Sequence, residues 1–176
     1  MKKILAFGGS TSSSSINRTF AAHAAGLVPD AEITVLDLRE LSLPIYSSDE
    51  EEANGAPPDA QRFLDAIRES DGVVVSLAEH NGSYAAAFKN IYDWASRIEQ
   101  KVWADKPMLL LSTSPGGRGG ATVLEAGKAT FPRMGANLIA SMSFPSFYDN
   151  FQDGSVIDAD LSAELRTAVE AFAQAL

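Results

Sequence analysis

Four consecutive serines, Ser12 to Ser15, follow a short apolar segment and a pair of glycines near the start of the sequence. This loop carries no lysine, so it lacks the Walker A pattern, and it also lacks the G-x-G-x-x-G pattern of dinucleotide-binding folds. Its hydroxyl groups, its successive backbone N–H groups and a helix that begins near Asn17 are instead suited to a phosphate. Without a lysine to neutralise a transferring phosphoryl group, the loop is expected to hold a phosphate rather than transfer it. A flexible surface turn that ends in a helix N-cap is the alternative.

Two further loops have a composition that suits a flat ligand. The segment "AEHNGSYAAAFKNIYDW" contains Asn81-Gly82-Ser83, which bends the backbone and offers N–H groups just before a helix. The segment "STSPGGRGGAT" contains four glycines, which let the backbone approach a ligand closely. A phosphate pocket beside backbone donors and acceptors matches flavin mononucleotide (FMN), whose pyrimidine edge carries acceptors and one donor.

Five apolar runs are predicted to be the strands that position these loops. Their β-branched and leucine residues form nearly continuous hydrophobic stretches, which is typical of parallel strands buried on both faces. The alternation of strands and helices predicts a three-layer α/β fold, a flavodoxin-like five-stranded parallel sheet of order 2-1-3-4-5 with helices on both faces. The ligand is expected beside strands 1 and 3 at their carboxyl ends. The runs are "KILAF", "EITVLDL", "GVVVSL", "PMLLLS" and "ANLIASM".

Helical spacing of apolar residues predicts five helices between and after the strands. A capping box from Thr122 to Glu125 is expected to open the fourth helix, which would run through Met134, and residues 161–176 form the fifth. Residues 39–58 are an acidic, proline-rich excursion after strand 2, and residues 143–160 form a long aromatic loop after strand 5. The first three helices are marked by Phe20, Ala24 and Leu27, by Phe63, Leu64 and Ile67, and by Ala87, Ile91, Trp94 and Ile98.

The bulk properties favour one globular domain over residues 1–176 and narrow the choice of partners. The net charge of −9 and the pI near 4.6 argue against nucleic acid and anionic membranes as partners. The absence of cysteine excludes disulfides, thiolate metal sites and thiol nucleophiles, and it suits a reducing compartment. The N-terminal apolar run is too short for a secretion signal, and no run is long enough to span a bilayer. A cytoplasmic protein is therefore expected.

The motifs of this chain resemble those of the NADPH-dependent FMN reductase family, which also includes quinone, chromate and azo-dye reductases. The resemblance covers nearly the whole chain, and it includes "SPGGRGG" and "FQDGSVID". The family's phosphate loop, G-S-x-R-x-x-S-x-N, is matched by Gly9, Ser10, Ser15 and Asn17. The family's flavin loop, P-E-Y-N-G-S followed by K-N-x-x-D-W, is matched by Glu79, Asn81, Gly82, Ser83, Lys89, Asn90, Asp93 and Trp94.

Three residues depart from the family pattern. Ser12 stands where the family has an arginine, which removes a bidentate phosphate contact. Ala78 and His80 replace the proline and the tyrosine of the flavin loop. These changes bear on flavin affinity and substrate choice more than on the fold.

The resemblance implies an FMN-dependent oxidoreductase that takes hydride from NADPH or NADH and passes it to a flavin, a quinone or another small acceptor. It also implies a homodimer or homotetramer. The chemistry belongs to FMN, so no catalytic side chain and no metal are expected. FMN contacts are expected at Ser10, Ser12, Ser15, Ile16 and Asn17 for the phosphate, at Glu79, His80, Asn81, Gly82 and Ser83 for the ring, and at Ser114, Gly116 and Gly117 on the far side.

Several individual roles remain open at this point. Arg118 is expected either to contact the phosphate of NADPH or to be a solvated loop residue. For Glu79, accepting backbone N–H bonds is favoured over acting as a base. A packed His80 is favoured over one that donates to the flavin or to a quinone, and His23 is interpreted as a surface or interface residue.

Two other functions are compatible with an FMN site. A flavodoxin-type electron carrier would also be small and acidic, but it would not oxidise NAD(P)H rapidly. A flavin-binding or sensor module without efficient turnover is the other alternative, and Ser12 and His80 are the residues that support it. A hydrolase is disfavoured because the sequence has no G-x-S-x-G elbow.

Overall fold

A five-stranded parallel sheet forms the centre of the computed structural model, which describes residues 1–176. The strands lie in the order β2-β1-β3-β6-β7, which confirms the predicted order 2-1-3-4-5 of a flavodoxin-like sheet. Every residue of the central strand β3 is buried, as its continuous apolar run requires. The strands are β1 (Lys2–Gly8), β2 (Ala31–Leu36), β3 (Gly72–Leu77), β6 (Pro107–Thr113) and β7 (Asn137–Phe144).

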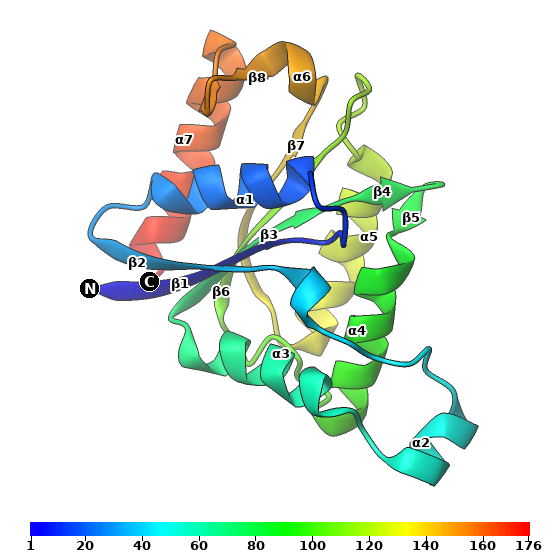
Figure 1. The fold of residues 1–176 in the computed structure, drawn as a ribbon. Helices are drawn as coiled ribbons and strands as arrows, with labels where there is room; N and C mark the ends of the chain where they lie inside the picture. The colour runs from blue at the N-terminus through cyan, green and yellow to red at the C-terminus, as the bar shows by residue number, and fades with distance from the viewer.

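Helices cover both faces of this sheet, and each face has its own hydrophobic core (Figure 1). Successive side chains of β1 alternate between the two cores, so that Leu5 and Phe7 face one layer while Ile4 and Ala6 face the other. The three-layer α/β prediction is therefore confirmed. Helices α1 (Ile16–Gly26) and α7 (Ala159–Gln174) form one layer, and α3 (Pro58–Glu69), α4 (Ala86–Ile98) and α5 (Ala121–Thr130) form the other.

Aromatic side chains fill the core beneath α3, α4 and α5. The ring of Trp103 lies 4.6 Å from that of Phe131 and is nearly parallel to that of Phe7 at 6.5 Å. Burial of each such ring contributes on the order of 2 kcal/mol. Tyr148 is exposed, whereas five other aromatic residues of the chain are buried, namely Tyr92, Trp94, Trp103, Phe144 and Phe147.

The predicted capping box at the start of α5 is wrong. The N-cap is Gly120, two residues before Thr122; it adopts the left-handed region with φ +72° and provides no side-chain cap. The Thr122 hydroxyl accepts from the Arg118 guanidinium at 2.9 Å, and the carboxylate of Glu79 accepts from the Val123 N–H at 2.9 Å. The cap thus comes from a residue 44 positions away, which local spacing cannot reveal. The helix also ends at Thr130, before the 3-10 turn η2 (Phe131–Met134).

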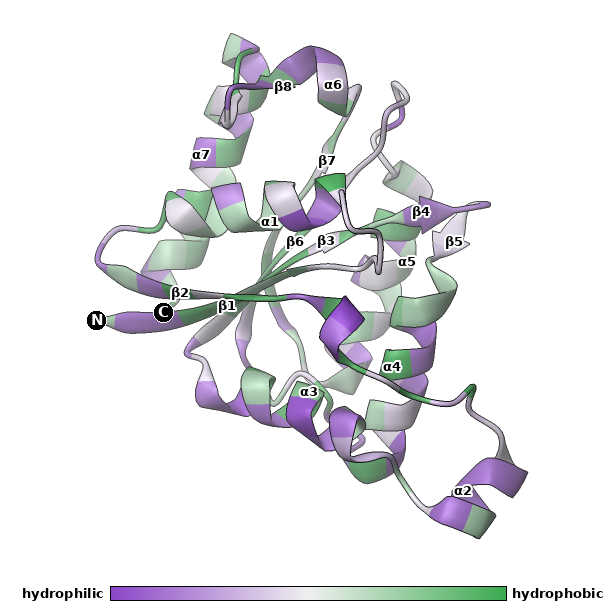
Figure 2. Ribbon diagram, viewed as in Figure 1, coloured by the Kyte–Doolittle hydropathy of each residue, from purple (hydrophilic) through white to green (hydrophobic).

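The excursion over residues 39–58 is fastened to α4. It contains the 3-10 turn η1 (Leu38–Glu40) and the short helix α2 (Ser48–Asn54), which has no buried residue and projects from the body as a hydrophilic arm (Figure 2). The Pro44 carbonyl accepts from the Trp94 indole at 2.8 Å and from the Asn90 amide at 2.9 Å. These two residues of α4 thereby fix the path of the excursion.

Three short elements extend beyond the carboxyl edge of the sheet or lie beside it. A hairpin of β4 (Glu79–His80) and β5 (Ser83–Tyr84) follows β3, with positive φ at Asn81 and Gly82. The loop over residues 143–160 holds the helix α6 (Phe147–Asn150) and a second hairpin, β8 (Phe151–Gln152) with β9 (Ser155–Val156). None of the helices combines the length and the apolar character that crossing a membrane requires.

Candidate cofactor site

A cavity of about 250 Å³ lies at the carboxyl edge of the sheet. Its walls are the loops that follow β1, β3 and β6, together with one residue of α6. This is the predicted position beside the first and third strands, where the chain departs to opposite faces of the sheet. The cavity therefore brings together three segments that are far apart in the sequence.

Eight of the thirteen predicted FMN-contacting residues line this cavity. The hairpin tip and the first two glycines of the β6 loop are exposed and outside its wall, as is Arg118, which binds Thr122. The lining residues are Ser10, Ser12, Ser15, Ile16, Asn17, Glu79, His80 and Ser114. Those outside it are Asn81, Gly82, Ser83, Gly116 and Gly117. Contact of either set with FMN stays a prediction.

Five lining residues were not predicted. Four of them are direct neighbours of predicted residues, so a wider window around each motif would have included them. Tyr148 has no such signal, because it comes from α6, which follows the β6 loop only after α5 and β7. The five are Ser14, Ala78, Thr113, Pro115 and Tyr148.

The first turn of α1 supplies backbone donors to the cavity. Ser15 is the N-cap of this helix, and its hydroxyl accepts from the Arg18 N–H at 3.1 Å. The N–H groups of Ile16 and Asn17 precede any intrahelical acceptor, so they remain available to an anion at the positive end of the helix dipole. A Cβ on Gly8 would lie 2.3 Å from the backbone nitrogen of Arg18, so only glycine lets the end of β1 approach this turn.

Asn17 connects the start of α1 to the ends of two strands through its side chain. The residue is 3% exposed, and its amide donates to the Thr113 carbonyl at 3.1 Å. Its carbonyl oxygen accepts from the Thr113 N–H at 3.0 Å and from the Ser76 hydroxyl at 2.7 Å. The side chain thus fixes the start of α1 against the ends of β3 and β6, while its backbone N–H is the group available to a phosphate.

An ion-pair cluster holds the serine loop from outside. The Arg18 guanidinium donates to the Ser13 carbonyl at 2.8 Å and to Asp37 at 2.6 Å, and Arg39 also binds Asp37 at 2.6 Å. Hydrogen bonds from the Arg39 side chain, with the charges of both arginines, lower the pKa of Asp37 to about 2. Because Arg18 is outside the cavity wall, the donors inside it at this end are neutral.

The two polar residues directly after β3, Glu79 and His80, have different surroundings. The carboxylate of Glu79 holds the first turn of α5 through Val123, in line with the preference for a structural role. His80 lines the cavity and is exposed rather than packed, contrary to the favoured interpretation. Its ring therefore faces solvent, as does that of Tyr148 in the same wall.

Three other candidate residues lie away from the cavity. His23 is half-buried on α1, with its ring edge-on to Phe151 at 5.1 Å, and desolvation lowers its pKa. His23, interpreted above as a surface or interface residue, therefore packs against Phe151 of its own chain. Lys89 and Asp93, which match the family's flavin-loop motif, form a surface ion pair on α4 at 2.5 Å.

Comparison with known proteins decides the family. Residues 2–149 match the model of the NADPH-dependent FMN reductases. The chain belongs to this family. Its members use FMN as the cofactor and NADPH as the electron donor, and the neutral donors at the α1 end of the cavity fit the FMN phosphate.

Two sequence relatives and one solved structure illustrate the similarity. An NAD(P)H-dependent FMN reductase of Pseudomonas aeruginosa is 37% identical over 115 residues, which span 65% of this chain and 60% of that protein. A probable NADPH:quinone oxidoreductase of rice is 29% identical over 93% of this chain and 86% of its own. The structure of FerB, an NAD(P)H:(acceptor) oxidoreductase of Paracoccus denitrificans, matches with a TM-score of 0.80 and 29% identity, over 99% of this chain and 97% of its own.

Replacing Asn17 by alanine is expected to lower the free energy of unfolding of the cofactor-free protein by about 3 kcal/mol. The change leaves the Thr113 N–H, the Thr113 carbonyl and the Ser76 hydroxyl buried without partners, at about 1 kcal/mol each. Urea denaturation followed by circular dichroism measures this. Ser76→Ala removes only one of the three bonds and is expected to cost about 1 kcal/mol. Equal costs for the two variants would contradict the connecting role of Asn17.

Acid is expected to weaken the cluster around Asp37. Because the folded-state pKa of Asp37 lies below its unfolded value, the stabilisation is present above about pH 4 and is lost as the pH falls toward 2. Asp37→Asn should remove about 1 kcal/mol at pH 7 and flatten the pH dependence in this window. Thermal unfolding between pH 2 and pH 7 measures both effects. Glu52→Gln, at an exposed acid on α2, is the control, and a slope equal to wild type in Asp37→Asn would refute the assignment.

Proposed function

We propose that the chain is an FMN-dependent NAD(P)H oxidoreductase that passes hydride from NAD(P)H through FMN to a flavin, a quinone or another small acceptor. The observation that supports this most is the cavity at the carboxyl ends of β1 and β3, which joins the neutral donors of α1 to the hairpin after β3. The family match and the names of the relatives point to the same reaction class. When bound, FMN supplies the ability to take up and release a hydride.

The side chains and backbone of this protein bind and orient the cofactor in this proposal. The N–H groups of Ile16 and Asn17, with the hydroxyls of Ser12 and Ser14, hold the phosphate. The hairpin β4–β5 and Ser114 lie along the ring. Asn17 keeps these segments at a fixed spacing, because its side chain bonds to residues at the ends of β3 and β6. Positioning of this kind needs no acid, base or nucleophile in the wall.

A homodimer or homotetramer in the cytoplasm is part of the same proposal. A groove of about 260 Å³ lies between the excursion and the start of α4 and reaches Thr11 of the serine loop. Leu43, Ile45 and Ile91 line it, and Ile45 is 79% exposed, so a second copy of the chain would cover apolar surface beside the cofactor cavity. The absence of cysteine suits a reducing compartment.

An absorbance spectrum tests the proposal directly. The purified protein is mixed with FMN, the excess is removed, and NADPH is then added without oxygen. Flavin bands that are retained and bleach within seconds are the expected result. Bands that persist would support an electron carrier or a sensor, and a protein that retains no flavin would contradict the cofactor site.

A carboxylate in the cavity wall should abolish flavin retention. Ser14 lines the cavity and is exposed, so Ser14→Glu places a negative charge beside the phosphate without disturbing the core. FMN affinity, measured by fluorescence titration, is expected to fall at least about 100-fold. Ser13→Glu is the matched control, because Ser13 is exposed but outside the wall. Equal effects of the two substitutions would place the phosphate elsewhere.

A further inference from the structure

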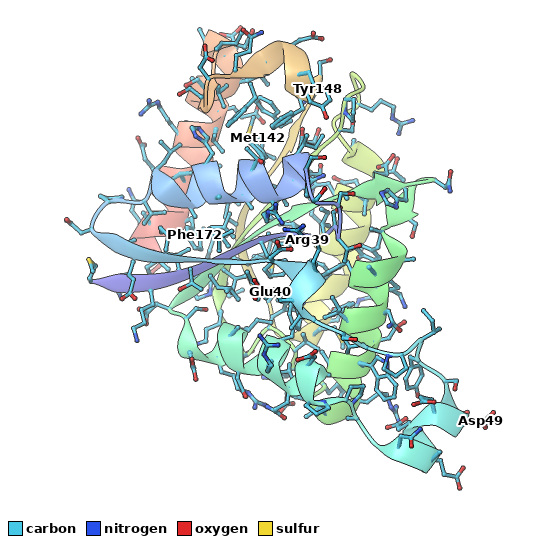
Figure 3. The ribbon with its side chains drawn as sticks, viewed as in Figure 1. Arg39, Glu40, Asp49, Met142, Tyr148 and Phe172 are labelled. Carbon is cyan, nitrogen blue, oxygen red and sulfur yellow. The ribbon has the colours of Figure 1, made fainter.

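Tyr148 is an exposed aromatic residue in the wall of the cofactor cavity. The residue is 64% exposed, although the other aromatic residues along β7 and α6 are buried or half-buried. It shares the cavity with Ser12, Ser14 and Ser15, and it lies on α6 above the N-terminal end of α1 (Figure 3). Tyr148 is therefore at the end of the cavity where the phosphate donors are.

The backbone beneath Tyr148 is held in place. The N–H of Ser146 donates to the Gly116 carbonyl at 2.9 Å, and the N–H of Phe147 donates to the Ser114 carbonyl at 3.1 Å. Phe147 is 5% exposed, and its ring lies edge-on to that of Tyr148 at 5.6 Å. Tyr148 is therefore exposed even though the backbone next to it is held by hydrogen bonds.

The phenol of Tyr148 differs from those of two other tyrosines in its hydrogen bonding. The hydroxyl of Tyr46 binds the carboxylate of Glu51, and that of Tyr84 binds the Thr130 hydroxyl. Tyr148 forms no hydrogen bond within the chain, so its O–H can donate to a ligand. An ionised acceptor makes such a bond shorter and stronger than a neutral one does.

The phosphate end of the cavity lacks a cation that could replace this donor. The Arg18 guanidinium donates hydrogen bonds to Asp37 and to the Ser13 carbonyl, and Arg18 is not part of the wall. Ser12 stands where the family has an arginine, so this position supplies no positive charge either. A phosphate dianion here depends on neutral N–H and O–H donors, so one further hydroxyl has a measurable effect on affinity.

We propose that the Tyr148 hydroxyl donates a hydrogen bond to the terminal phosphate of FMN and that its ring closes this end of the cavity. The inference rests on the proposed function, because it takes the cavity to be the FMN site. In FAD the same phosphate continues into a second phosphate and an adenosine, which need the space that the ring occupies. Tyr148 thereby selects the mononucleotide over the dinucleotide.

Affinities for three flavins separate the hydroxyl from the ring. FMN, riboflavin and FAD are titrated into cofactor-free wild type, Tyr148→Phe and Tyr148→Ala, with flavin fluorescence as the readout. Tyr148→Phe is expected to weaken FMN binding about tenfold while leaving riboflavin, which has no phosphate, within about twofold of wild type. Tyr148→Ala should weaken FMN at least as much and bring the FAD affinity about tenfold closer to that of FMN.

The controls distinguish this inference from the proposed function. Tyr46→Phe removes a phenol hydroxyl on the excursion, away from the cavity, and should change none of the three affinities. Unchanged FMN affinity in both Tyr148 variants, or equal losses for FMN and riboflavin, would overturn the role at the phosphate while leaving the reductase intact. If wild-type protein does not bind FMN, and NADPH does not bleach the flavin absorbance, the proposed function itself would be overturned.

Discussion

The hydrogen bonds of the Asn17 side chain are the constraint on which the rest of the site depends. A parallel sheet places the ends of β1, β3 and β6 at one edge, but it does not fix how the loops beyond those ends are spaced. Asn17 fixes this spacing because it bonds to Ser76 and to both backbone groups of Thr113 from the first turn of α1. Burial makes these bonds costly to lose, so they hold the start of α1 firmly against the ends of β3 and β6.

The proposed phosphate site at the same edge has no arginine or lysine in its wall. Arg18 lies outside the wall, where its guanidinium donates to Asp37 and to the Ser13 carbonyl. Inside the wall, donors come from the first turn of α1 and from hydroxyls. Such a site binds through geometry and the helix dipole, so its selectivity depends on how its open end is closed.

Local patterns were sufficient for the fold, and they were insufficient wherever a contact joins distant segments. Apolar runs predicted all five strands, and the alternation of strands with helices predicted their order. The central strand β3 is buried throughout as expected, whereas β2 and β7 lie at the edges of the sheet and are only partly buried. The start of α5 was predicted wrongly because its cap is Glu79, and the signal at Thr122 and Glu125 was only local. Tyr148 was not predicted as a lining residue, since nothing in its neighbourhood indicates that α6 returns to the cavity.

Several residues that match the family motifs hold the backbone in place. Asn17 connects strand ends, Glu79 caps α5, and Asn90 and Trp94 fasten the excursion. Ser12 and His80, which depart from the motifs, are exposed and face the cavity. A substitution at a backbone-holding position costs stability, whereas one at an exposed lining position changes only what the cavity binds. The motifs therefore identify the framework of the site, and the departures from them, together with Tyr148, are where this chain sets its own affinity and choice of ligand.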